Sequence, residues 1–348
     1  MYKYAVMQNP GHNRVYFNSS GKLAKNELFA LFENNISEIK EEMLGGVEYI
    51  TFEKESLISE EDIILLSRLS FVYAIFEVQN HAFIPIVKNH SYFFGDDLNM
   101  ILKYSGKTNE IFTRMMINLA VFAGGFKYKF LDNLNLLDPV CGKGTTVFDG
   151  LICGYNSFGI DISGKLIEES VNFLKKYLET GKYKHNLKKE KISGINNNSN
   201  NKNNIQFKSQ RYLFDIAKNK EDQKSDKTLL CEFIDGETEN ADKYYKKNTF
   251  DIIVGDLPYG IQHENASHGN KMRNPTSLIT ASLPVWLNVL KPGGSVVLAW
   301  NTFLLNRGEL ERIFTANKLE IPDFGIFGDF SHRVDQAINR DVIIGVKR

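Results

Sequence analysis

The segment DLPYG, residues 256–260, follows the apolar run FDIIVG and combines an acid, a proline, an aromatic ring and a glycine. A plain turn needs the proline and the glycine, but neither the acid nor the ring. The carboxylate of Asp256 and the backbone carbonyl of Leu257 can both accept hydrogen bonds. Pro258 stiffens the turn, and Tyr259 adds an aromatic face on which another ring can stack. By itself the pattern also fits an ordinary turn, so its context decides its meaning.

The context is a glycine-containing loop, LLDPVCGKGTTVFDG, at an expected strand-to-helix junction. Gly142 and Gly144 let the backbone approach a ligand, and Asp161 follows at the end of the next expected strand, where an acid accepts hydrogen bonds from ribose hydroxyls. A dinucleotide fingerprint would need a third glycine near Val147, which is absent. Asp138 before the loop would repel a pyrophosphate but suits the ammonium and sulfonium groups of S-adenosylmethionine. A tight structural turn remains the alternative.

Strands and helices alternate around these two motifs from about residue 106 onward, which predicts an open, mainly parallel, doubly wound α/β sheet. Ligands of such sheets bind beyond the carboxyl ends of the strands, where both motifs lie. The expected strands are residues 133–138, 157–161, 228–235, 250–256, 295–300 and 340–348, and the expected helices are residues 108–125, 144–154, 163–181, 277–290 and 308–318.

The first hundred residues have a different pattern. We expect strands at 2–7, 14–18, 47–52 and 71–78 and helices at 21–32 and 59–70. Ser20 is the expected N-cap of the first helix, and Ser59 with Asp62 forms a capping pattern for the second. The order β-β-α-β-α-β is similar to a ferredoxin-like module. The chain therefore divides into an N-terminal α/β domain at residues 1–100, for which RNA binding is one role, and a second domain at residues 101–348.

The motifs of the second domain resemble those of class I S-adenosylmethionine-dependent methyltransferases, which have a seven-stranded sheet with an antiparallel last strand. DPVCGKGTT, GIDIS and DGETENA resemble three of their motifs, and KPGG is also typical. The resemblance implies that Glu237 faces the adenine, with Asp235 as the alternative. The cofactor-binding residues that it implies are Asp138, Pro139, Cys141, Gly142, Gly144, Thr145, Asp161, Ile162, Glu237 and Asp256.

DLPYG resembles the [DN]-P-P-[YF] motif of methyltransferases that act on exocyclic amines. Its spelling is most similar to that of the tRNA N2-guanosine methyltransferases that often carry a THUMP domain, although a complete THUMP domain is not evident in residues 1–105. The resemblance implies an RNA methyltransferase acting on guanine N2 in tRNA, with Asp256, Leu257, Pro258 and Tyr259 as its catalytic residues. A DNA adenine-N6 or cytosine-N4 methyltransferase, a non-catalytic nucleic-acid binding protein and a protein glutamine methyltransferase are the alternatives.

The composition limits the class of protein. The chain has 348 residues, and 42 Lys and Arg balance 42 Asp and Glu, so net charge alone indicates no polyanionic partner. The three cysteines lack metal-type spacing and are too few for a disulfide scaffold. No run approaches the roughly 18 apolar residues of a membrane span, and the first residues lack a signal-peptide stretch. We expect a cytoplasmic protein with no membrane span and no metal.

A basic, low-complexity insertion interrupts the second domain at about residues 182–227. It holds 12 Lys or Arg against 5 Asp or Glu and contains the run INNNSNNKNN, for which we expect mobility. Two interpretations stay open: a solvated insertion, which is the usual meaning of a charge run in a loop, and an arm that contacts phosphates.

Four further features have two interpretations each. Cys141 can pack in the core or act as a nucleophile, and packing is favoured because no cysteine lies beside the DLPYG motif. Thr108, in GKTNE, is expected to cap a helix rather than contact the cofactor. A late hairpin carries His332, Arg333 and Arg340, either ion-paired with Asp335 and Asp341 or facing the substrate. After the motif, His263, Lys271 and Arg273 lie in a loop that can order over the target.

Overall fold

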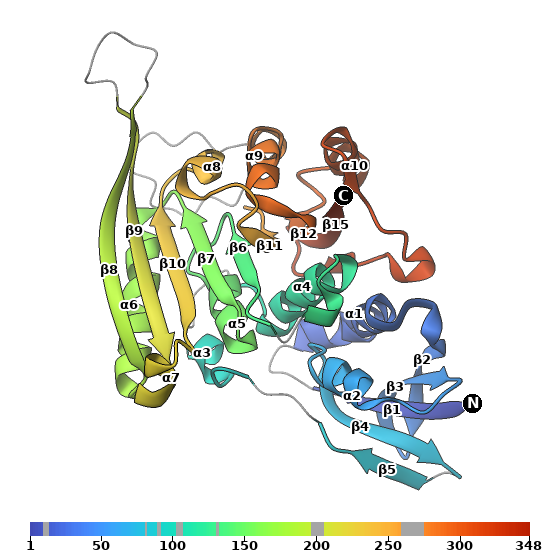
Figure 1. Ribbon diagram of the computed structural model, residues 1–348. Coiled ribbons are helices and arrows are strands. Elements are labelled where there is room, and N and C mark those ends of the chain that lie inside the picture. The colour runs from blue at the N-terminus through green and yellow to red at the C-terminus, as the bar shows by residue number, and fades with distance from the viewer. Residues whose placement is uncertain are drawn as a thin grey trace.

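The computed structural model describes residues 1–9, 14–80, 82–88, 92–101, 107–129, 132–195, 205–258 and 275–348. These residues form a five-stranded sheet near the N-terminus and a ten-stranded sheet in the rest of the chain (Figure 1). The helices are α1 Arg14–Phe32, α2 Glu60–Ser67, α3 Asp97–Met100, α4 Glu110–Ala123, α5 Thr145–Cys153, α6 Gly164–Thr180, α7 Lys220–Lys224, α8 Ala241–Tyr244, α9 Pro275–Val289 and α10 Arg307–Ala316.

The large sheet has the strand order β13-β15-β12-β11-β6-β7-β10-β9-β8, with β14 paired to β15. Its strands are β6 Asn135–Asp138, β7 Asn156–Asp161, β8 Lys184–Ile195, β9 Ile205–Ala217, β10 Leu229–Asp235, β11 Phe250–Asp256, β12 Leu290–Asn301, β13 Leu319–Glu320, β14 His332–Arg333 and β15 Asn339–Lys347. Strands β10, β7, β6, β11 and β12 run parallel, and β15 is antiparallel to β12. The strands from β13 to β10 therefore form the expected seven-stranded sheet with an antiparallel last strand.

The chain reverses its direction of winding between β6 and β11. From β6 it proceeds outward through β7 to β10, and it then returns to place β11 on the other side of β6. A crevice for ligands opens at such a switch point, beyond the carboxyl ends of the strands. Because β6 ends at Asp138 and β11 at Asp256, the two motifs of the sequence meet there.

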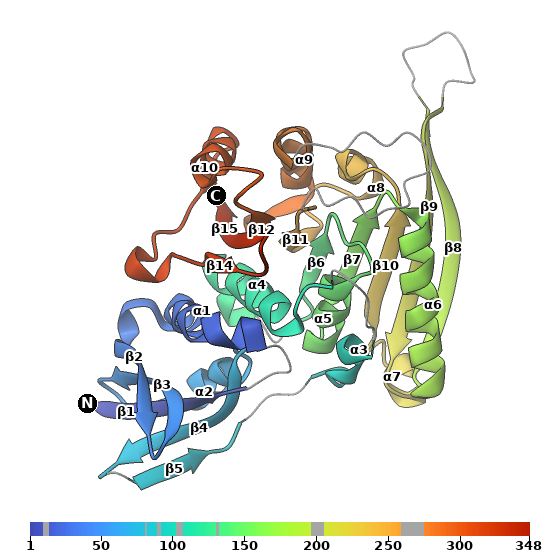
Figure 2. The same ribbon diagram turned by 180° about the vertical axis from the view of Figure 1, so that it is seen from behind.

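Helices cover both faces of the large sheet (Figures 1 and 2). On one face, α4, α5 and α6 pack with side chains such as Met116, Val147 and Leu174 at complete burial. On the other face, α8, α9 and α10 pack around Trp286 and Phe314. This two-sided burial explains why the central strand FDIIVG is apolar at nearly every position, since a strand covered on both faces shows no polar alternation.

The N-terminal sheet has the order β2-β3-β1-β4-β5 with all pairs antiparallel. Its strands are β1 Tyr2–Gln8, β2 Ser37–Leu44, β3 Val47–Lys54, β4 Val72–Gln79 and β5 Ala82–Ile86. The element order up to β4 is β-α-β-β-α-β, which is the ferredoxin-like order, and β5 adds an edge strand. The expected module is confirmed, but its expected element order is wrong.

The error lies at the start of α1. Residues 14–18, expected as a strand, form the first turns of this helix, so Ser20 lies inside α1 and is not its N-cap. Its hydroxyl contacts the side chain of Gln8 instead, at 3.2 Å. The capping box of Ser59 and Asp62 on α2 is confirmed.

The N-terminal unit and the large sheet share one apolar cluster, in which α1 packs on α4. A buried polar network crosses the same contact. Asn118 of α4 donates to the carboxyl of Glu27 at 2.7 Å and to the carbonyl of Arg68 at 2.9 Å, and the Ser70 hydroxyl also contacts Glu27. Burial raises the pKa of Glu27 to about 7, against the lowering effect of these hydrogen bonds.

The expected insertion forms a long antiparallel hairpin, β8 and β9, along the β10 edge of the sheet. The last β10 pair is Asp235 with Gln210, yet the hairpin continues to the pair of Ile195 with Ile205. It therefore projects beyond the carboxyl ends of the parallel strands, as Figure 2 shows. Most of the run INNNSNNKNN, residues 196–204, lies outside the described residues.

Candidate active site

Two glycines shape the loop between β6 and α5. Gly144, the N-cap of α5, has φ +84°, and a β-carbon there would lie 3.1 Å from the Phe233 ring. Gly142 has φ +52°, and a β-carbon added there would meet no atom within 4 Å. Left-handed backbone favours glycine at both positions. The open space at Gly142 lets a ligand approach the loop, as the spacing of the glycines predicts.

Asp161 ties this loop to the end of β7. Its Oδ2 accepts the N–H of Gly142 at 2.8 Å, and its Oδ1 accepts the N–H of Ser163, also at 2.8 Å. Burial raises the pKa of Asp161, and these two hydrogen bonds oppose the shift. Ser163 is the N-cap of α6, and its hydroxyl accepts the N–H of Leu166. A carboxylate oxygen can accept two hydrogen bonds, and each oxygen of Asp161 accepts one from the backbone. Asp161 therefore retains acceptor capacity for hydroxyl groups.

Asp138 is a buried acid at the end of β6. Burial raises its pKa to about 7, while hydrogen bonds from Val140 and Thr146 lower it and the charges of Asp161 and Asp256 raise it further. The Val140 N–H lies 3.1 Å from Oδ1. A carboxyl in this state binds a cation well, because a neighbouring positive charge offsets both its burial and its acidic neighbours.

The end of β10 adds two further acids, Asp235 and Glu237, to Asp138 and Asp161. Asp235 stands directly opposite Asp161 in the parallel pairing of β7 and β10, and burial raises its pKa as well. Glu237 follows as the N-cap of a short 3-10 helix, Thr238–Asn240. Ile162, which follows Asp161, is 52% exposed and presents an apolar side chain beside these acids. The expected cofactor-binding residues at the ends of β6, β7 and β10 thus lie on one edge of the sheet.

Asp256 lies at the end of β11, against the same loop. A β-carbon added at Gly255 would lie 3.3 Å from Val140 and 3.4 Å from Pro139, so the end of β11 packs against this loop. The next residue, Leu257, has a buried side chain, and its N–H donates to the carbonyl of Ala299 at 2.9 Å. This hydrogen bond fixes the peptide plane at the start of the DLPYG turn. Pro258 is exposed, and Tyr259 lies outside the described residues.

Residues 129–301 match a family model described as RMKL-like, methyltransferase domain. This part of the chain is a methyltransferase domain. The match confirms the expected class I enzyme of the RNA methylase type, while a link to THUMP-associated enzymes stays a prediction. No curated protein matches the sequence.

Several solved structures are similar to the chain. A putative RNA methyltransferase from Pyrococcus horikoshii has 10% identity and a TM-score of 0.38, covering 72% of this chain and 96% of that chain. Magnesium protoporphyrin IX methyltransferase from Synechocystis PCC 6803 has 11% identity and a TM-score of 0.36, with coverage of 70% and 87%. An rRNA methylase from Streptococcus thermophilus has 11% identity and a TM-score of 0.33, with coverage of 63% and 93%. Likenesses at this level indicate nothing about the substrate.

The cofactor of the methyltransferase domain is S-adenosyl-L-methionine, and the residues present fit it. The open space at Gly142 accommodates a ligand beside the loop. The acids Asp138, Asp161 and Asp235 match a molecule with two cationic centres and ribose hydroxyls. Among the described residues, no group of three or more side chains could hold a metal ion, and no helix is long and apolar enough to cross a membrane.

Cys141 is a packing residue of the methyltransferase domain. Its side chain is buried, and burial raises the pKa of its thiol well above the usual value, which opposes formation of a nucleophilic thiolate. A β-carbon at Gly159 would lie 2.7 Å from its sulfur, so the absence of a side chain in β7 makes room for it. Thr145, the first residue of α5, is also buried.

Two expected features have different partners in the structure. Asn109, not Thr108, caps α4, and the Thr108 hydroxyl donates to Asp256 Oδ2 at 2.6 Å. Arg340 pairs with the same oxygen at 3.6 Å rather than with an acid of its own hairpin. Sequence reasoning missed both contacts with Asp256, and only the GKTNE segment gave any signal.

Arg333 and His332 of the late hairpin contact other parts of the protein. β14 pairs with β15 as expected. Arg333 donates to the backbone carbonyls of Asp335 and Gln336, and His332 is buried beside Phe112. Burial lowers the pKa of His332 to about 4. His263, Lys271 and Arg273 lie outside the described residues.

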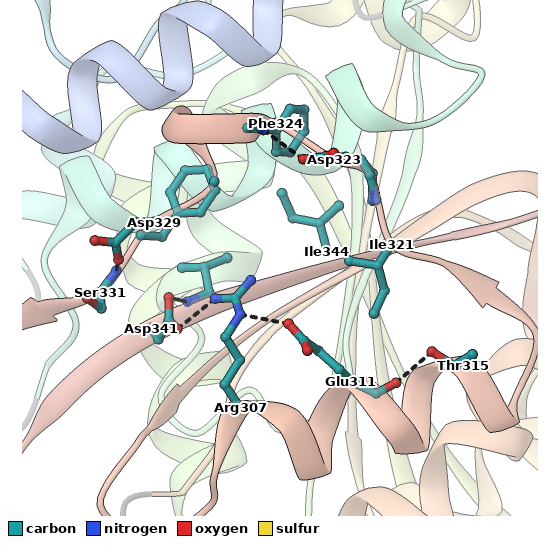
Figure 3. Close-up of a pocket in the computed structure, with 15 residues that line it drawn as sticks. Arg307, Glu311, Thr315, Ile321, Asp323, Phe324, Asp329, Ser331, Asp341 and Ile344 are labelled. Atoms are coloured by element: carbon teal, nitrogen blue, oxygen red, sulfur yellow. Dashed lines mark hydrogen bonds and ion pairs between the residues drawn. The ribbon is translucent and has the colours of Figure 1, made fainter.

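An open cavity of about 780 Å³ lies next to this hairpin, between α10 and residues 321–331 (Figure 3). Within it Arg307 donates to Glu311 at 2.8 Å and to Asp341 at 2.7 Å. Asp341 neighbours Arg340 on β15, and successive strand residues point to opposite faces of a sheet. The lining of the cavity includes residues of both faces of β15, since Val342 and Ile344 share the face of Arg340, but neither Asp256 nor Arg340 lines it.

Proposed function

We propose that the protein is an S-adenosylmethionine-dependent RNA N-methyltransferase that acts on an exocyclic base amine, with guanine N2 in tRNA as the first candidate. The observation that carries the proposal is the close packing of Gly255 against Pro139, which brings Asp256 to the cofactor loop. A turn does not need an acid at this place, whereas an acid can accept a hydrogen bond from a base amine. The cytoplasm is the proposed location, in keeping with three free, buried cysteines.

In this proposal the cofactor lies along the ends of β6, β7 and β10. Asp138 faces its cationic part, Asp161 binds the ribose hydroxyls and Glu237 faces the adenine, with Asp235 as the alternative. The exposed side chain of Ile162 covers the adenine face, which accounts for an apolar group among acids. Bound here, S-adenosylmethionine supplies a methyl group on a positively charged sulfur.

The base amine is prepared by two acceptors of the chain. Asp256 accepts one N–H, and the carbonyl of Leu257 accepts the other. The N–H of Leu257 donates to Ala299 and holds the preceding peptide, between Asp256 and Leu257, in place before the base arrives. Both contacts favour a pyramidal nitrogen with its lone pair directed at the methyl carbon, and a proton leaves the nitrogen after transfer. Tyr259 stacks on the base, and Pro258 stiffens the turn.

Nucleic acid as the partner is supported by the hairpin of β8 and β9. Alternate residues of a strand share a face, so Lys191 and Ser193 of β8 point to the same side of the hairpin. Lys208 of β9 pairs with Ser193 and points to that side as well. Lys189, Lys191 and Lys208 therefore share one face of the hairpin, and all three are exposed. The hairpin rises past the carboxyl ends of the strands (Figure 1), so its lysines can contact phosphates of an RNA whose base enters the site.

The experiment that tests this function offers tritiated S-adenosylmethionine and the purified protein to total tRNA, rRNA and DNA from cells that lack the protein. We expect label in tRNA, and nucleoside mass spectrometry should identify the product as N2-methylguanosine. Label in rRNA alone would contradict tRNA as the substrate, and label in DNA alone would reject the RNA assignment. Label confined to protein would reject both.

A further inference from the structure

The carboxylate of Asp256 is held by two residues from distant parts of the chain. Thr108, which precedes α4, donates its hydroxyl hydrogen to Oδ2 at 2.6 Å across a separation of 148 residues. Arg340, at the start of β15, places its guanidinium 3.6 Å from the same oxygen. Both partners reach Asp256 from the face of the sheet that α4 covers.

Arg340 is itself fixed within the fold. Its side chain is 6% exposed, and its guanidinium lies 4.8 Å from the centre of the Phe112 ring on α4. Its backbone lies between Asn301 of β12 and His332 of β14. A buried guanidinium needs a carboxylate to offset its lost hydration, and it returns a strong field to that carboxylate. Because burial keeps His332 neutral at physiological pH, it adds no second positive charge beside Arg340.

The ion pair of Arg340 with Asp256 joins two strands that are not neighbours in the sheet. β12 separates β15 from β11, and Ala299 of β12 pairs with Asp256 on one side and with Val342 on the other. Arg340 lies two residues before Val342, so it shares the face of Ala299. The small side chain of Ala299 leaves the diagonal path from Arg340 to Asp256 open.

We propose that Thr108 and Arg340 are positioning residues for methyl transfer. They hold the Asp256 carboxylate in one orientation, ready to accept the N–H of the incoming amine. The proposal rests on the proposed function of Asp256 and assigns to these two residues no contact with substrate or cofactor. Preorganised acceptors of this kind act mainly on the transition state, so their loss lowers kcat more than it raises the KM for the cofactor.

The test measures initial rates of methyl transfer from tritiated S-adenosylmethionine to RNA from cells that lack the protein. The variants are Arg340→Met, Arg340→Lys, Thr108→Val and Thr108→Ser, each alone and combined with Asp256→Asn. We expect kcat to fall about ten- to a hundredfold in Arg340→Met and Thr108→Val, as for a misplaced reacting group. Thr108→Ser, which keeps the hydroxyl, should restore most of the rate. Arg340→Lys keeps the charge and should retain more activity than Arg340→Met.

The double variants separate positioning from a general structural role. If Arg340 and Thr108 act through Asp256, adding either change to Asp256→Asn costs nothing more, whereas independent damage to the fold would multiply the losses. Arg307→Gln is the matched control, because it breaks the ion pair to Asp341, the next residue of β15, on the opposite face. Its rate should equal that of the unmodified protein.

The outcomes distinguish the two proposals. Full activity in Asp256→Asn would reject the proposed role of Asp256 itself. A large loss in Asp256→Asn with full activity in Arg340→Met and Thr108→Val would reject only the positioning role. Multiplicative losses in the double variants would also reject it. Should Arg340→Met fail to fold, the pair Thr108→Val and Thr108→Ser, at a half-buried position, carries the same test.

Discussion

The carboxylate of Asp161 accepts the backbone N–H of Gly142, 19 residues earlier in the chain, at 2.8 Å. A residue expected to bind ribose hydroxyls thus also closes the loop that faces the cofactor. The same side chain receives the N–H of Ser163, so it links the loop, the end of β7 and the start of α6. The geometry of the loop therefore depends on Asp161, and in the proposed function cofactor binding depends on the same acid.

Replacement of Asp161 by alanine should weaken cofactor binding by about ten- to a hundredfold, because two backbone N–H groups lose their acceptor and the loop loses its tie to β7. Isothermal titration calorimetry with S-adenosylmethionine measures the dissociation constant. RNA binding, measured by filter retention, should not change. An unaltered dissociation constant for the cofactor would show that Asp161 neither binds it nor holds the loop.

Replacement of Asp138 by asparagine should stabilise the cofactor-free protein at pH 8. The folded-state pKa of Asp138, about 7, lies above the value of roughly 4 in an unfolded chain. Its contribution to stability is therefore fully present below about pH 4 and is lost as the pH rises through about 7. We expect the variant to gain on the order of 4 kcal/mol at pH 8 and nothing at pH 4.

Denaturant unfolding at the two pH values measures this difference. The side-chain oxygen of asparagine can still accept the Val140 N–H, so the variant removes the charge and retains this hydrogen bond. A variant less stable than the unmodified protein at pH 8 would mean that the ionised carboxyl is favourably paired in the folded state, contrary to its burial.

Replacement of Lys189, Lys191 and Lys208 by glutamine should weaken RNA binding by about tenfold and reduce the slope of log K against log salt by about 2, as for the loss of two or three phosphate contacts. The matched control changes Lys220, Lys224 and Lys227, which are exposed around α7 at the opposite end of the hairpin. Equal effects of the two triple variants would reject a directed contact, because total charge alone would then explain the binding.

Replacement of Asn118 by leucine should lower the free energy of unfolding by about 1–3 kcal/mol, because the buried carboxyl of Glu27 loses one of its donors and keeps only those of Ser70. Asn118 joins α4 to the N-terminal unit, so this variant measures how strongly the two parts stabilise each other. The double variant with Glu27→Leu should recover part of the loss, since it removes both members of the pair. No recovery would show that Glu27 is not the partner that matters.

Local signals in the sequence predicted the parts of the fold that depend on neighbouring residues. Ser59 and Asp62 form the expected capping box because a cap needs only the next few N–H groups. The strand predicted at residues 14–18 was wrong because Val15, Tyr16 and Phe17 favour strands locally, whereas the helix that continues to Phe32 includes them. The β8–β9 hairpin was not predicted. The polar residues of β8 occupy both faces and give no apolar alternation, and the short alternation of Tyr212, Phe214 and Ile216 in β9 lies within a charged segment.

The sequence predicted the strand-end acids of the candidate site but not the contact between Arg340 and Asp256. Asp138, Asp161 and Asp256 end parallel strands, so strand prediction alone placed them on one edge. The contact of Arg340 with Asp256 depends on β12 lying between two strands that are far apart in the sequence. No spacing in the chain encodes that arrangement, and the acids of its own hairpin were the nearer partners to expect.

The most direct test of the account is single-turnover methyl transfer by the Asp256→Ala variant, measured beside its affinity for S-adenosylmethionine. The account predicts unchanged cofactor affinity and a rate lower by a factor on the order of a hundred or more, as for the loss of a transition-state acceptor. A variant that transfers the methyl group at the original rate would contradict the assignment of Asp256 as the acceptor of the base amine.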